Sequence, residues 1–188
     1  MHPVKYLWAV RALFYKLFMK KVGFMSYIGE PCFVEGMKGI SIGNRVRIFP
    51  GLRIQAIGTG KIKICDNTAI EQNVHIISYE RELVIGENTT ISANVFISNV
   101  NHSYEKIGQH VIEQDLVYKE TVINENCFIG YGAVILPGTN LGKQCIVGAN
   151  SVVKGIIPDQ CVVAGNPAHI IKKYNKETMQ WEKMGFRM

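Results

Sequence analysis

The residue in this chain whose type and surroundings best suit chemistry is His102. It lies in Asn101-His102-Ser103-Tyr104, near the start of a polar run over residues 99–120. An imidazole with its ordinary pKa near 6.5 is largely neutral at pH 7 and can take a proton from a reacting hydroxyl. The oxygen then attacks a carbonyl, and N–H donors stabilise the tetrahedral oxyanion. His102 is therefore a candidate general base.

A catalytic histidine needs a group that orients its second ring nitrogen. The candidates in the same run are Glu105, Glu113 and Asp115, and Glu71 is a separate candidate outside it. The residue types alone leave the choice among them open.

The cysteines indicate neither a disulfide framework nor a zinc site, because their number is odd and no Cys-x-x-Cys pair occurs. We interpret them as buried free thiols that pack as small hydrophobic side chains. Free thiols suit a reducing compartment, so we expect a cytoplasmic protein. None of them is required as a nucleophile when a base activates the attacking hydroxyl directly.

A six-residue repeat reveals the elements that must position His102. Residues 129–152 read as four successive units, and each unit opens with an aliphatic residue and carries a small residue four places later. The same unit recurs upstream, opened by Ile28, Ile42, Ile64, Ile70, Ile85, Ile91 and Ile123. This period suits neither a helix nor a hairpin meander.

Short strands joined by tight corners fit the period. The aliphatic residue points inward, and Asn or Gly occupies corners where positive φ is tolerated. Three sides close a triangular coil of eighteen residues, so Cys127 and Cys145 should lie one above the other. We predict an all-β fold in which stacked coils bury a continuous core.

The repeat resembles that of the hexapeptide-repeat acyltransferases over about residues 28–171, including Ala164-Gly165-Asn166-Pro167-Ala168, which is similar to the family's closing element. The resemblance implies a left-handed parallel β-helix; the hand comes from the family and not from the spacing. The Asn-His-x-Tyr form at 101–104, followed by Gln114, is similar to members that O-acetylate polysaccharide or lipopolysaccharide sugars. The family's members that acetylate sugars place a catalytic histidine at this point, just before their long loop, so the resemblance implies that His102 is the general base.

The family also implies a donor and an acceptor site. The donor is acetyl-CoA, used in direct transfer to a sugar hydroxyl without a metal. In the maltose and galactoside O-acetyltransferases, which this chain also resembles, an Asn one coil before the histidine contacts the acyl or acceptor region. Here Glu71-Gln72-Asn73 stands near that place, and we favour Glu71. The expected substrate-binding residues are Glu71, Asn73, Tyr104 and Gln114.

Acetyl-CoA is expected along the C-terminal coils. By this resemblance its pantetheine arm meets small residues, for which Gly130, Ala133, Gly148 and Ala149 qualify. Its phosphates are expected to meet Lys154 and Lys172, although Lys154 matches the family's cation only approximately.

Length predicts one domain. We divide the chain into an N-terminal amphipathic helical cap (1–27), the β-helix acyltransferase domain (28–171) with a protruding loop at 99–120, and a C-terminal short helix or tail (172–188). Two shorter breaks in the repeat lie at residues 55–61 and 78–82. Basic residues interrupt the apolar segment 1–22, which therefore does not read as a spanning helix. Capping of the first coil and peripheral contact with the inner face of a membrane are both compatible with it.

Composition adds bounds on partners. The charged fraction is 19% and the hydrophobic fraction 47%, which suits a chain that hides surface in an oligomer. With the family's habit of forming sites between subunits, this favours a homotrimer. The net charge of +6 suits phosphates or an anionic surface, while no nucleic-acid-binding motif accompanies it.

The sequence is compatible with other activities. An N-acyltransferase acting on an amino sugar, or a non-sugar acceptor, would need the same base. Zinc enzymes like carbonic anhydrase share this fold, but the gaps between His75, His102 and His110 fit their ligand spacing poorly. A non-catalytic scaffold would lack the long loop. Serine and antibiotic acetyltransferases are disfavoured because they carry additional helical parts.

Overall fold

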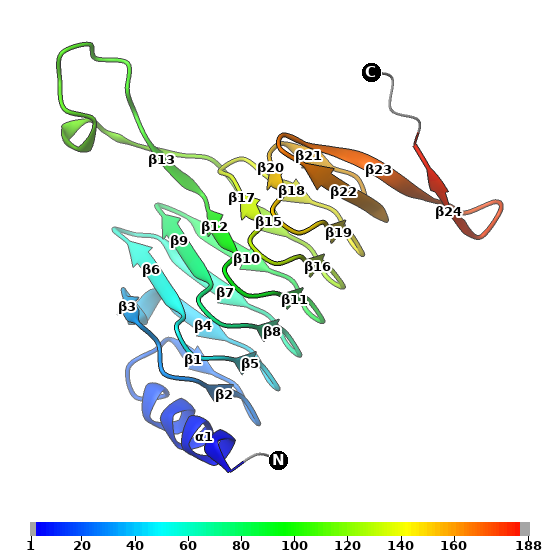
Figure 1. Ribbon diagram of the computed structural model, residues 1–188. Helices are drawn as coiled ribbons and strands as arrows, with labels where there is room; N and C mark the ends of the chain where they lie inside the picture. Colours follow the sequence, from blue (N-terminus) through cyan, green and yellow to red (C-terminus); the bar gives the residue numbers. More distant parts are fainter. Residues whose placement is uncertain (1–2, 185–188) are drawn as a thin grey trace.

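The computed structural model describes residues 3–184, so residues 1–2 and 185–188 of the predicted terminal segments lie outside the described chain. Parallel strands wind around a triangular prism whose three sides are sheets A, B and C (Figure 1). Helix α1 (Val4–Tyr15) covers one end of the prism.

Sheets A and C consist of short parallel strands. Sheet A runs β1 (Lys21–Val22), β4 (Ile40–Ile42), β7 (Lys61–Ile64), β10 (Glu82–Ile85), β15 (Val122–Ile123), β18 (Asn140–Leu141) and β21 (Ile156–Ile157). Sheet C runs β3 (Phe33–Glu35), β6 (Arg53–Ile57), β9 (His75–Tyr79), β12 (Phe96–Ser98), β17 (Val134–Ile135) and β20 (Val152–Val153).

Sheet B is longer because two antiparallel strands extend it. It runs β2 (Tyr27–Ile28), β5 (Arg47–Ile48), β8 (Ala69–Ile70), β11 (Thr90–Ile91), β16 (Phe128–Ile129), β19 (Ile146–Val147), β22 (Cys161–Gly165), β23 (Ala168–Asn175) and β24 (Gln180–Lys183). The remaining elements are β13 (Val100–His102), β14 (Leu116–Tyr118) and two 3₁₀ turns, Met37–Gly39 and Val111–Glu113.

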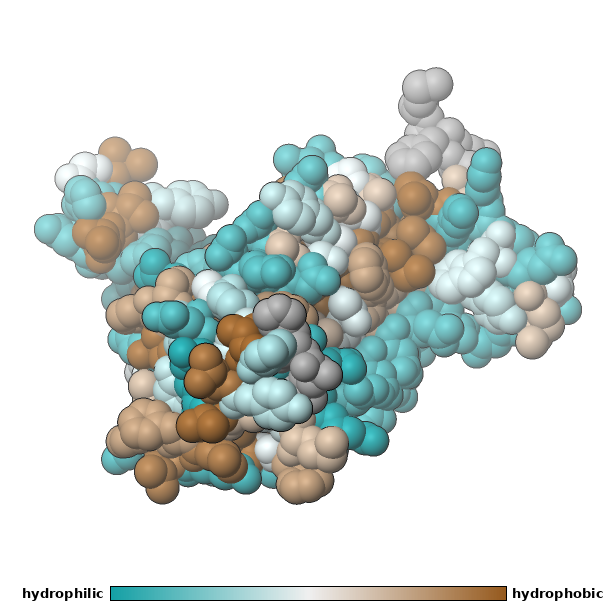
Figure 2. All heavy atoms as spheres, turned by 60° about the horizontal axis from the view of Figure 1, so that its bottom comes forward, coloured by the Kyte–Doolittle hydropathy of each residue, from teal (hydrophilic) through white to brown (hydrophobic). Residues whose placement is uncertain are grey.

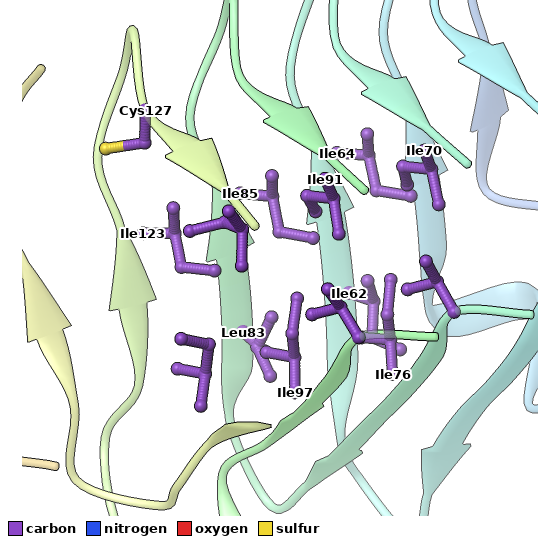
Figure 3. Packing of buried hydrophobic residues seen from close by; sticks show 14 of the residues in the cluster. Ile62, Ile64, Ile70, Ile76, Leu83, Ile85, Ile91, Ile97, Ile123 and Cys127 are labelled. Carbon is purple, nitrogen blue, oxygen red and sulfur yellow. The ribbon is translucent and has the colours of Figure 1, made fainter. Parts of the chain in front are cut away.

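Stacked aliphatic side chains fill the prism. In sheet A, Ile64 pairs with Ile85, and Ile85 with Ile123, so like residues stack along the axis of the prism (Figure 3). Each of these side chains is at most 1% exposed. Because each coil repeats the same inward pattern, one hydrophobic core runs along the whole axis, as the repeat predicts.

The corners of the prism use left-handed backbone, as the repeat also predicts. Asn67, Asn88 and Asn126 have φ near +55 to +60° at equivalent corners of successive coils. Asn tolerates this region better than other residues with a Cβ. The polar residues at these places are therefore explained by backbone geometry.

The two ends of the chain differ in detail from the expected segments. The first strand of the coil, β1, begins at Lys21, ahead of the predicted boundary at residue 28. At the other end, residues 172–175 and 180–183 form strands joined by a turn, and not a short helix, because β23 turns back after Pro167 and pairs antiparallel with β22, and β24 then pairs with β23. Sheet pairing satisfies the backbone groups of this edge.

We name the corners by the sheets that they join. The A–B corner leads from sheet A to sheet B, the B–C corner from sheet B to sheet C, and the C–A corner from sheet C back to sheet A. The three predicted breaks, 55–61, 78–82 and 99–120, all fall at the C–A corner, where β6, β9 and β12 end. Within residues 3–184, no helix is both long enough and apolar enough to cross a bilayer.

Candidate active site

Residues 99–120 form an arm that projects from the C–A corner (Figure 1). Its two strands, β13 and β14, pair antiparallel, with His102 opposite Leu116. The backbone N–H of Ser103 also donates to the Asp115 carbonyl at 2.8 Å. His102 therefore lies on a hydrogen-bonded ribbon, which holds its backbone more firmly than an irregular loop would.

The His102 side chain is exposed to solvent. No hydrogen-bond partner of its imidazole is present within residues 3–184. The acidic candidates of the arm, Glu105, Glu113 and Asp115, are likewise exposed. The single chain thus presents the predicted base without an orienting group.

Gln114 is the buried polar residue of the arm, at 5% exposed. Its Nε2 donates to the carbonyls of Lys106 at 3.2 Å and Gln109 at 3.1 Å. Its Oε1 accepts from the N–H of Lys106 at 3.1 Å. Both polar atoms of the side chain are thereby engaged, so in this structure Gln114 braces the arm from inside. Tyr104, by contrast, is 76% exposed.

The base of the arm depends on Asn99, which the sequence reading did not single out. Asn99 is fully buried, and its Oδ1 accepts from the N–H of Tyr79 at 2.8 Å. Its Nδ2 donates to the Ser78 hydroxyl at 3.1 Å, and its carbonyl accepts from the N–H of Lys119 at 2.9 Å. A polar residue at the place where the repeat stops was the available signal for such an anchor.

Glu71 and Asn73 lie at the B–C corner, where the strands of sheet C begin, whereas the arm leaves from the C–A corner, where they end. Strands β9 and β12 run between the two corners, so His102 is on the order of 20 Å from this pair at about 3.3 Å per residue. The structure therefore does not bring either residue next to His102 of the same chain.

The small residues chosen for the cofactor also line the B–C corner, but they differ in exposure. Ala149 is exposed and Gly148 half-buried, whereas Gly130 is buried. The prediction that Ala133 contacts the cofactor is wrong. Its side chain is 0% exposed and belongs to the core, because the small residue four places after Ile129 points inward. It cannot contact a ligand on the surface.

The two lysines predicted for the phosphates lie apart in the fold. Lys154 is exposed at the C–A corner directly after β20. Lys172 is half-buried on β23, where it pairs with Val162 on one side and Lys183 on the other. The predicted site is thus distributed over the B–C corner, the C–A corner and β23.

The outer face of sheet C, between the two corners, carries a polar network that the sequence reading also missed. His75 Nε2 lies 3.1 Å from Gln55 Oε1, and Gln55 Nε2 donates to Glu35 Oε2 at 2.9 Å. Arg53 Nε donates to Gln55 Oε1 at 2.8 Å. Burial, and next the charge of Arg53, lower the pKa of His75 below its ordinary value. His75 is therefore held neutral at pH 7.

Known proteins share both the repeat and the fold. The family profile described as "Bacterial transferase hexapeptide (six repeats)" matches residues 120–155. A relative from Escherichia coli K12, named "Putative lipopolysaccharide biosynthesis O-acetyl transferase WbbJ", is 41% identical over 160 residues, which cover 81% of each chain. This protein belongs to the hexapeptide-repeat acyltransferases. The predicted family, its β-helix fold and the acyltransferase class are confirmed.

Two further proteins extend this comparison. The galactoside O-acetyltransferase of Lactococcus lactis is 27% identical over 80% of this chain, which spans 64% of that enzyme. The fold matches AntD, an N-acyltransferase from Bacillus cereus, solved as a point mutant in complex with dTDP-4-amino-4,6-dideoxyglucose and coenzyme A. The TM-score is 0.76 at 20% identity, over 89% of this chain and 90% of AntD.

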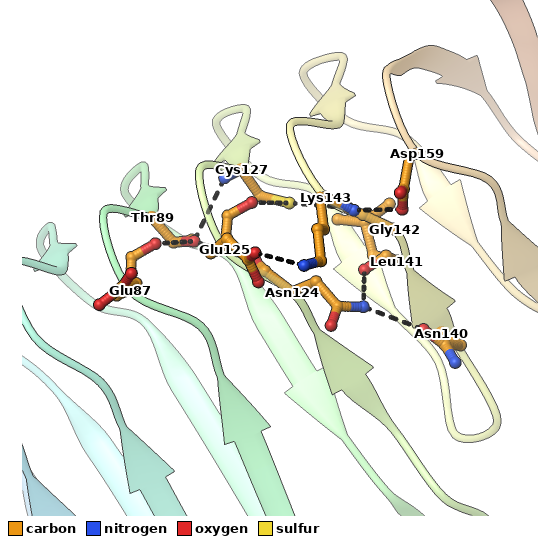
Figure 4. A network of polar contacts seen from close by, with 10 residues as sticks. All are labelled: Glu87, Thr89, Asn124, Glu125, Cys127, Asn140, Leu141, Gly142, Lys143 and Asp159. Carbon is orange, nitrogen blue, oxygen red and sulfur yellow. Dashed lines mark hydrogen bonds and ion pairs between the residues drawn. The ribbon is translucent and has the colours of Figure 1, made fainter.

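The thiols of this acyltransferase are placed for packing and not for attack. Cys127 and Cys145 are stacked in adjacent coils at the A–B corner, as predicted, and Cys161 follows in the next coil. Figure 4 shows this corner, where the Cys127 thiol donates to the Gly142 carbonyl at 3.2 Å beside the Lys143–Glu125 ion pair. Burial raises the pKa of Cys127 to about 12 and that of Cys145 to about 11.

The three histidines considered as zinc ligands do not come together on one element. His75 lies on sheet C, while His102 and His110 lie on the arm. Over residues 3–184, no three His, Cys, Asp or Glu side chains gather as metal ligands would.

Proposed function

We propose that this protein transfers the acetyl group of acetyl-CoA to a hydroxyl of a polysaccharide or lipopolysaccharide sugar, with His102 as general base. The observation that carries the proposal is the exposed imidazole of His102 on a braced arm, where the coil is interrupted. The similarity to WbbJ supports the sugar acceptor. The coenzyme A held by AntD supports the donor.

In the proposed reaction, neutral His102 takes the proton of the sugar hydroxyl as its oxygen attacks the thioester carbonyl. The tetrahedral oxyanion collapses, the C–S bond breaks, and the imidazolium returns its proton to the departing thiolate. The acetyl ester and free coenzyme A leave. No acyl-enzyme forms in this sequence, which agrees with cysteines whose thiolates are strongly disfavoured.

We further propose a homotrimer, because the predicted site is divided between the B–C corner and the C–A corner, at opposite ends of the strands of sheet C. If three prisms face a common axis through sheet C, the C–A corner of one copy adjoins the B–C corner of the next. The outer row of sheet C includes Phe33, Phe96, Val134 and Val152, which suits association. The arm tip also exposes Ile107 at 97% and Ile112 at 71%, apolar surface suited to contact with a neighbour.

The roles of the remaining residues follow from this arrangement. Glu71 and Asn73 contact the acceptor from the copy next to the His102 arm, and Tyr104 contacts it from the arm itself. Ala149 and Gly148 form the surface for the pantetheine, with Gly130 allowing close approach of the coils. Lys154 and Lys172 meet the phosphates. Gln114 acts through the arm, which it braces, and not by direct contact.

The base is tested with His102→Ala and the control His110→Ala, which alters an exposed histidine of the same arm. Wild-type protein is incubated with acetyl-CoA and candidate sugar nucleotides, lipid-linked oligosaccharides and surface glycans, and products are identified by mass spectrometry. His102→Ala should lower the transfer rate by about 10²–10⁴ with an unchanged circular dichroism spectrum, and His110→Ala far less. Equal losses in both variants would contradict the assignment.

The shared site is tested by complementation. His102→Ala and Ala149→Trp each disable one half of the proposed site, so each homotrimer should be inactive. Trimers assembled from both variants contain sites that unite an intact His102 with an intact B–C corner, and they should regain activity. Mixed trimers that remain inactive, or a fully active monomer in sedimentation, would refute a site between subunits.

Transfer to the amine of an amino sugar is the second candidate, favoured by the fold match to the N-acyltransferase AntD. The two reactions give products of different stability. Mild alkali releases acetate from an O-acetyl ester but leaves an N-acetyl amide intact, so alkaline treatment of the labelled product decides between them.

A further inference from the structure

The inner side of helix α1 packs against the first coils. Ala12 is buried against the coil, and so is Met19, just beyond the helix. The Trp8 ring lies 5.8 Å from that of Tyr27 and 5.6 Å from that of Phe49, measured between centroids. The inner side of the helix is thus already satisfied by the first coils.

The outer side of α1 and its continuation are hydrophobic, which reverses the polarity of an ordinary surface helix. Seven large apolar or aromatic side chains are between 47 and 77% exposed: Tyr6, Leu7, Val10, Leu13, Phe14, Leu17 and Phe18. Their spacing places them along one side of the helix. Figure 2 shows hydrophobic residues gathered at this end of the prism. A hydrophobic patch of this size on a protein surface marks a binding site.

The first coil adds two more exposed hydrophobic residues at its A–B corner. Phe24 is 73% exposed and Met25 is 68% exposed. Strand register aligns this pair with polar pairs in all the later coils: Asn44-Arg45, Asp66-Asn67, Glu87-Asn88, Glu125-Asn126, Lys143-Gln144 and Asp159-Gln160. The corner geometry is the same, because Met25 has the left-handed φ of 55°. The hydrophobic choice therefore belongs to this end and not to the corner.

Charge in the segment that precedes Glu30 has one sign. No Asp or Glu precedes Glu30, while Lys5, Arg11, Lys16, Lys20 and Lys21 are all basic. These five positive charges nearly equal the net charge of +6 of the whole chain. Lys16, Lys20 and Lys21 are exposed beside the hydrophobic residues. A hydrophobic face flanked by lysines suits the interface of an anionic bilayer.

We infer that this end of the protein docks peripherally on an anionic phospholipid surface. The docking face consists of the outer side of α1, its continuation to Phe18, and the Phe24-Met25 corner. The hydrophobic side chains enter the acyl boundary while the lysines meet the lipid phosphates. At twelve residues, α1 lies along such a surface and does not cross it.

A second copy of the chain is a poorer occupant of this face. Two copies meeting through α1 would bring together ten positive charges with no acidic residue among the first 29 positions of either chain. Like charges at an interface oppose association. An anionic lipid surface supplies the countercharge that a second copy lacks.

The test is co-sedimentation of the full chain with vesicles of phosphatidylcholine alone, or of phosphatidylcholine and phosphatidylglycerol in equal parts. Wild type should pellet with the anionic vesicles and much less with the neutral ones, and high salt should weaken binding. The double variant Leu13→Gln/Leu17→Gln should lose at least about tenfold in partitioning, because each leucine contributes hydrophobic transfer free energy. Lys16→Glu/Lys20→Glu should lose binding to the anionic vesicles.

The control is Ile107→Gln, which removes a hydrophobic residue of the arm that is even more exposed than Leu13 and Leu17, and it should bind vesicles like wild type. Circular dichroism confirms that each variant is folded, since none of these side chains is in the core. Wild type that stays in the supernatant with anionic vesicles, or variants that bind as wild type does, would overturn the inference. So would a face that proves to join two copies, seen as a change in sedimentation of Leu13→Gln/Leu17→Gln. Acetyl transfer to a soluble acceptor should be unchanged in this variant, so the result is independent of the proposed function.

Discussion

The carboxylate of Glu71 accepts a hydrogen bond from the backbone N–H of Ala93, 3.2 Å away and one coil further along the axis. This contact fixes Glu71 at the B–C corner, away from the arm of its own chain. Glu71 therefore does not reach His102 of its own subunit, and its proposed contact with the acceptor is made beside the arm of a neighbouring copy.

Replacement of Glu71 should separate its corner contact from its charge. Glu71→Ala leaves the Ala93 N–H unpaired and should lower the free energy of unfolding by about 1 kcal/mol. Glu71→Gln retains an accepting oxygen and should be nearly as stable as wild type, while its KM for the acceptor rises. Urea unfolding and steady-state kinetics measure the two effects. Equal destabilisation by both variants would contradict the role of the hydrogen bond.

Removal of the brace in the arm should affect the arm more than the coil. Gln114→Ala deletes the three hydrogen bonds of a buried side chain, so trypsin should cleave at Lys106 faster and the rate of acetyl transfer should fall. The thermal unfolding of the coil should change little. Gln109→Ala, which removes one exposed hydrogen bond, is the matched control. If its cleavage rate equals that of Gln114→Ala, the brace has no special role.

Lys154→Ala and Lys172→Ala should raise KM for acetyl-CoA and leave acceptor affinity unchanged. A charge contact that solvent reaches contributes on the order of 0–1 kcal/mol, so each effect should be several-fold at most and should fade with salt. Lys63→Ala, an exposed lysine on sheet A, is the control. Dephospho-coenzyme A binding as tightly as coenzyme A to wild type would show that neither lysine acts through the 3′-phosphate.

Lowering the pH should reduce the free energy of unfolding, because His75 becomes protonated more readily in the unfolded chain. Its folded pKa lies below the unfolded value of 6.5, so the unfolded chain binds more protons as pH drops. The contribution of neutral His75 is fully present above 6.5 and is lost as pH falls toward the folded pKa. Urea unfolding from about pH 7.5 to about pH 5.5 should show a shallower slope for His75→Gln than for wild type. Identical slopes would exclude His75 as the cause.

Thiol reagents should distinguish the exposed cysteine from the buried ones. Cys32 is exposed, whereas Cys127 and Cys145 are buried with raised pKa values of about 12 and about 11. In the folded protein Cys32 should react rapidly with a disulfide reagent, and the two buried thiols only after denaturation. Activity should survive modification of wild type and should be the same in Cys32→Ser. Rapid inactivation of Cys32→Ser would contradict direct transfer.

The period of six determined the fold because the same contact repeats in every coil. An aliphatic residue at one place has its equivalents directly above and below, so a local pattern fixes the inward direction of Ile64 and the stacking of Cys127 on Cys145. Asn67 and Asn88 were likewise readable as corner residues, since positive φ is a local property. The interruption before His102 was visible for the same reason, as a place where repetition stops.

Which corner each predicted residue occupies was decided only by the closed coil. Glu71 and Ala149 share the B–C corner although they are far apart in sequence, while His102 leaves from the C–A corner. The inward turn of Ala133, the engagement of Gln114 inside the arm and the strands of the C-terminal tail depend on packing and on sheet edges. By itself the sequence determined the repeated contacts of this acyltransferase, because they are local. The division of its candidate site between the two corners that bound sheet C arises from tertiary structure, because only the closed triangle sets the distance between corners.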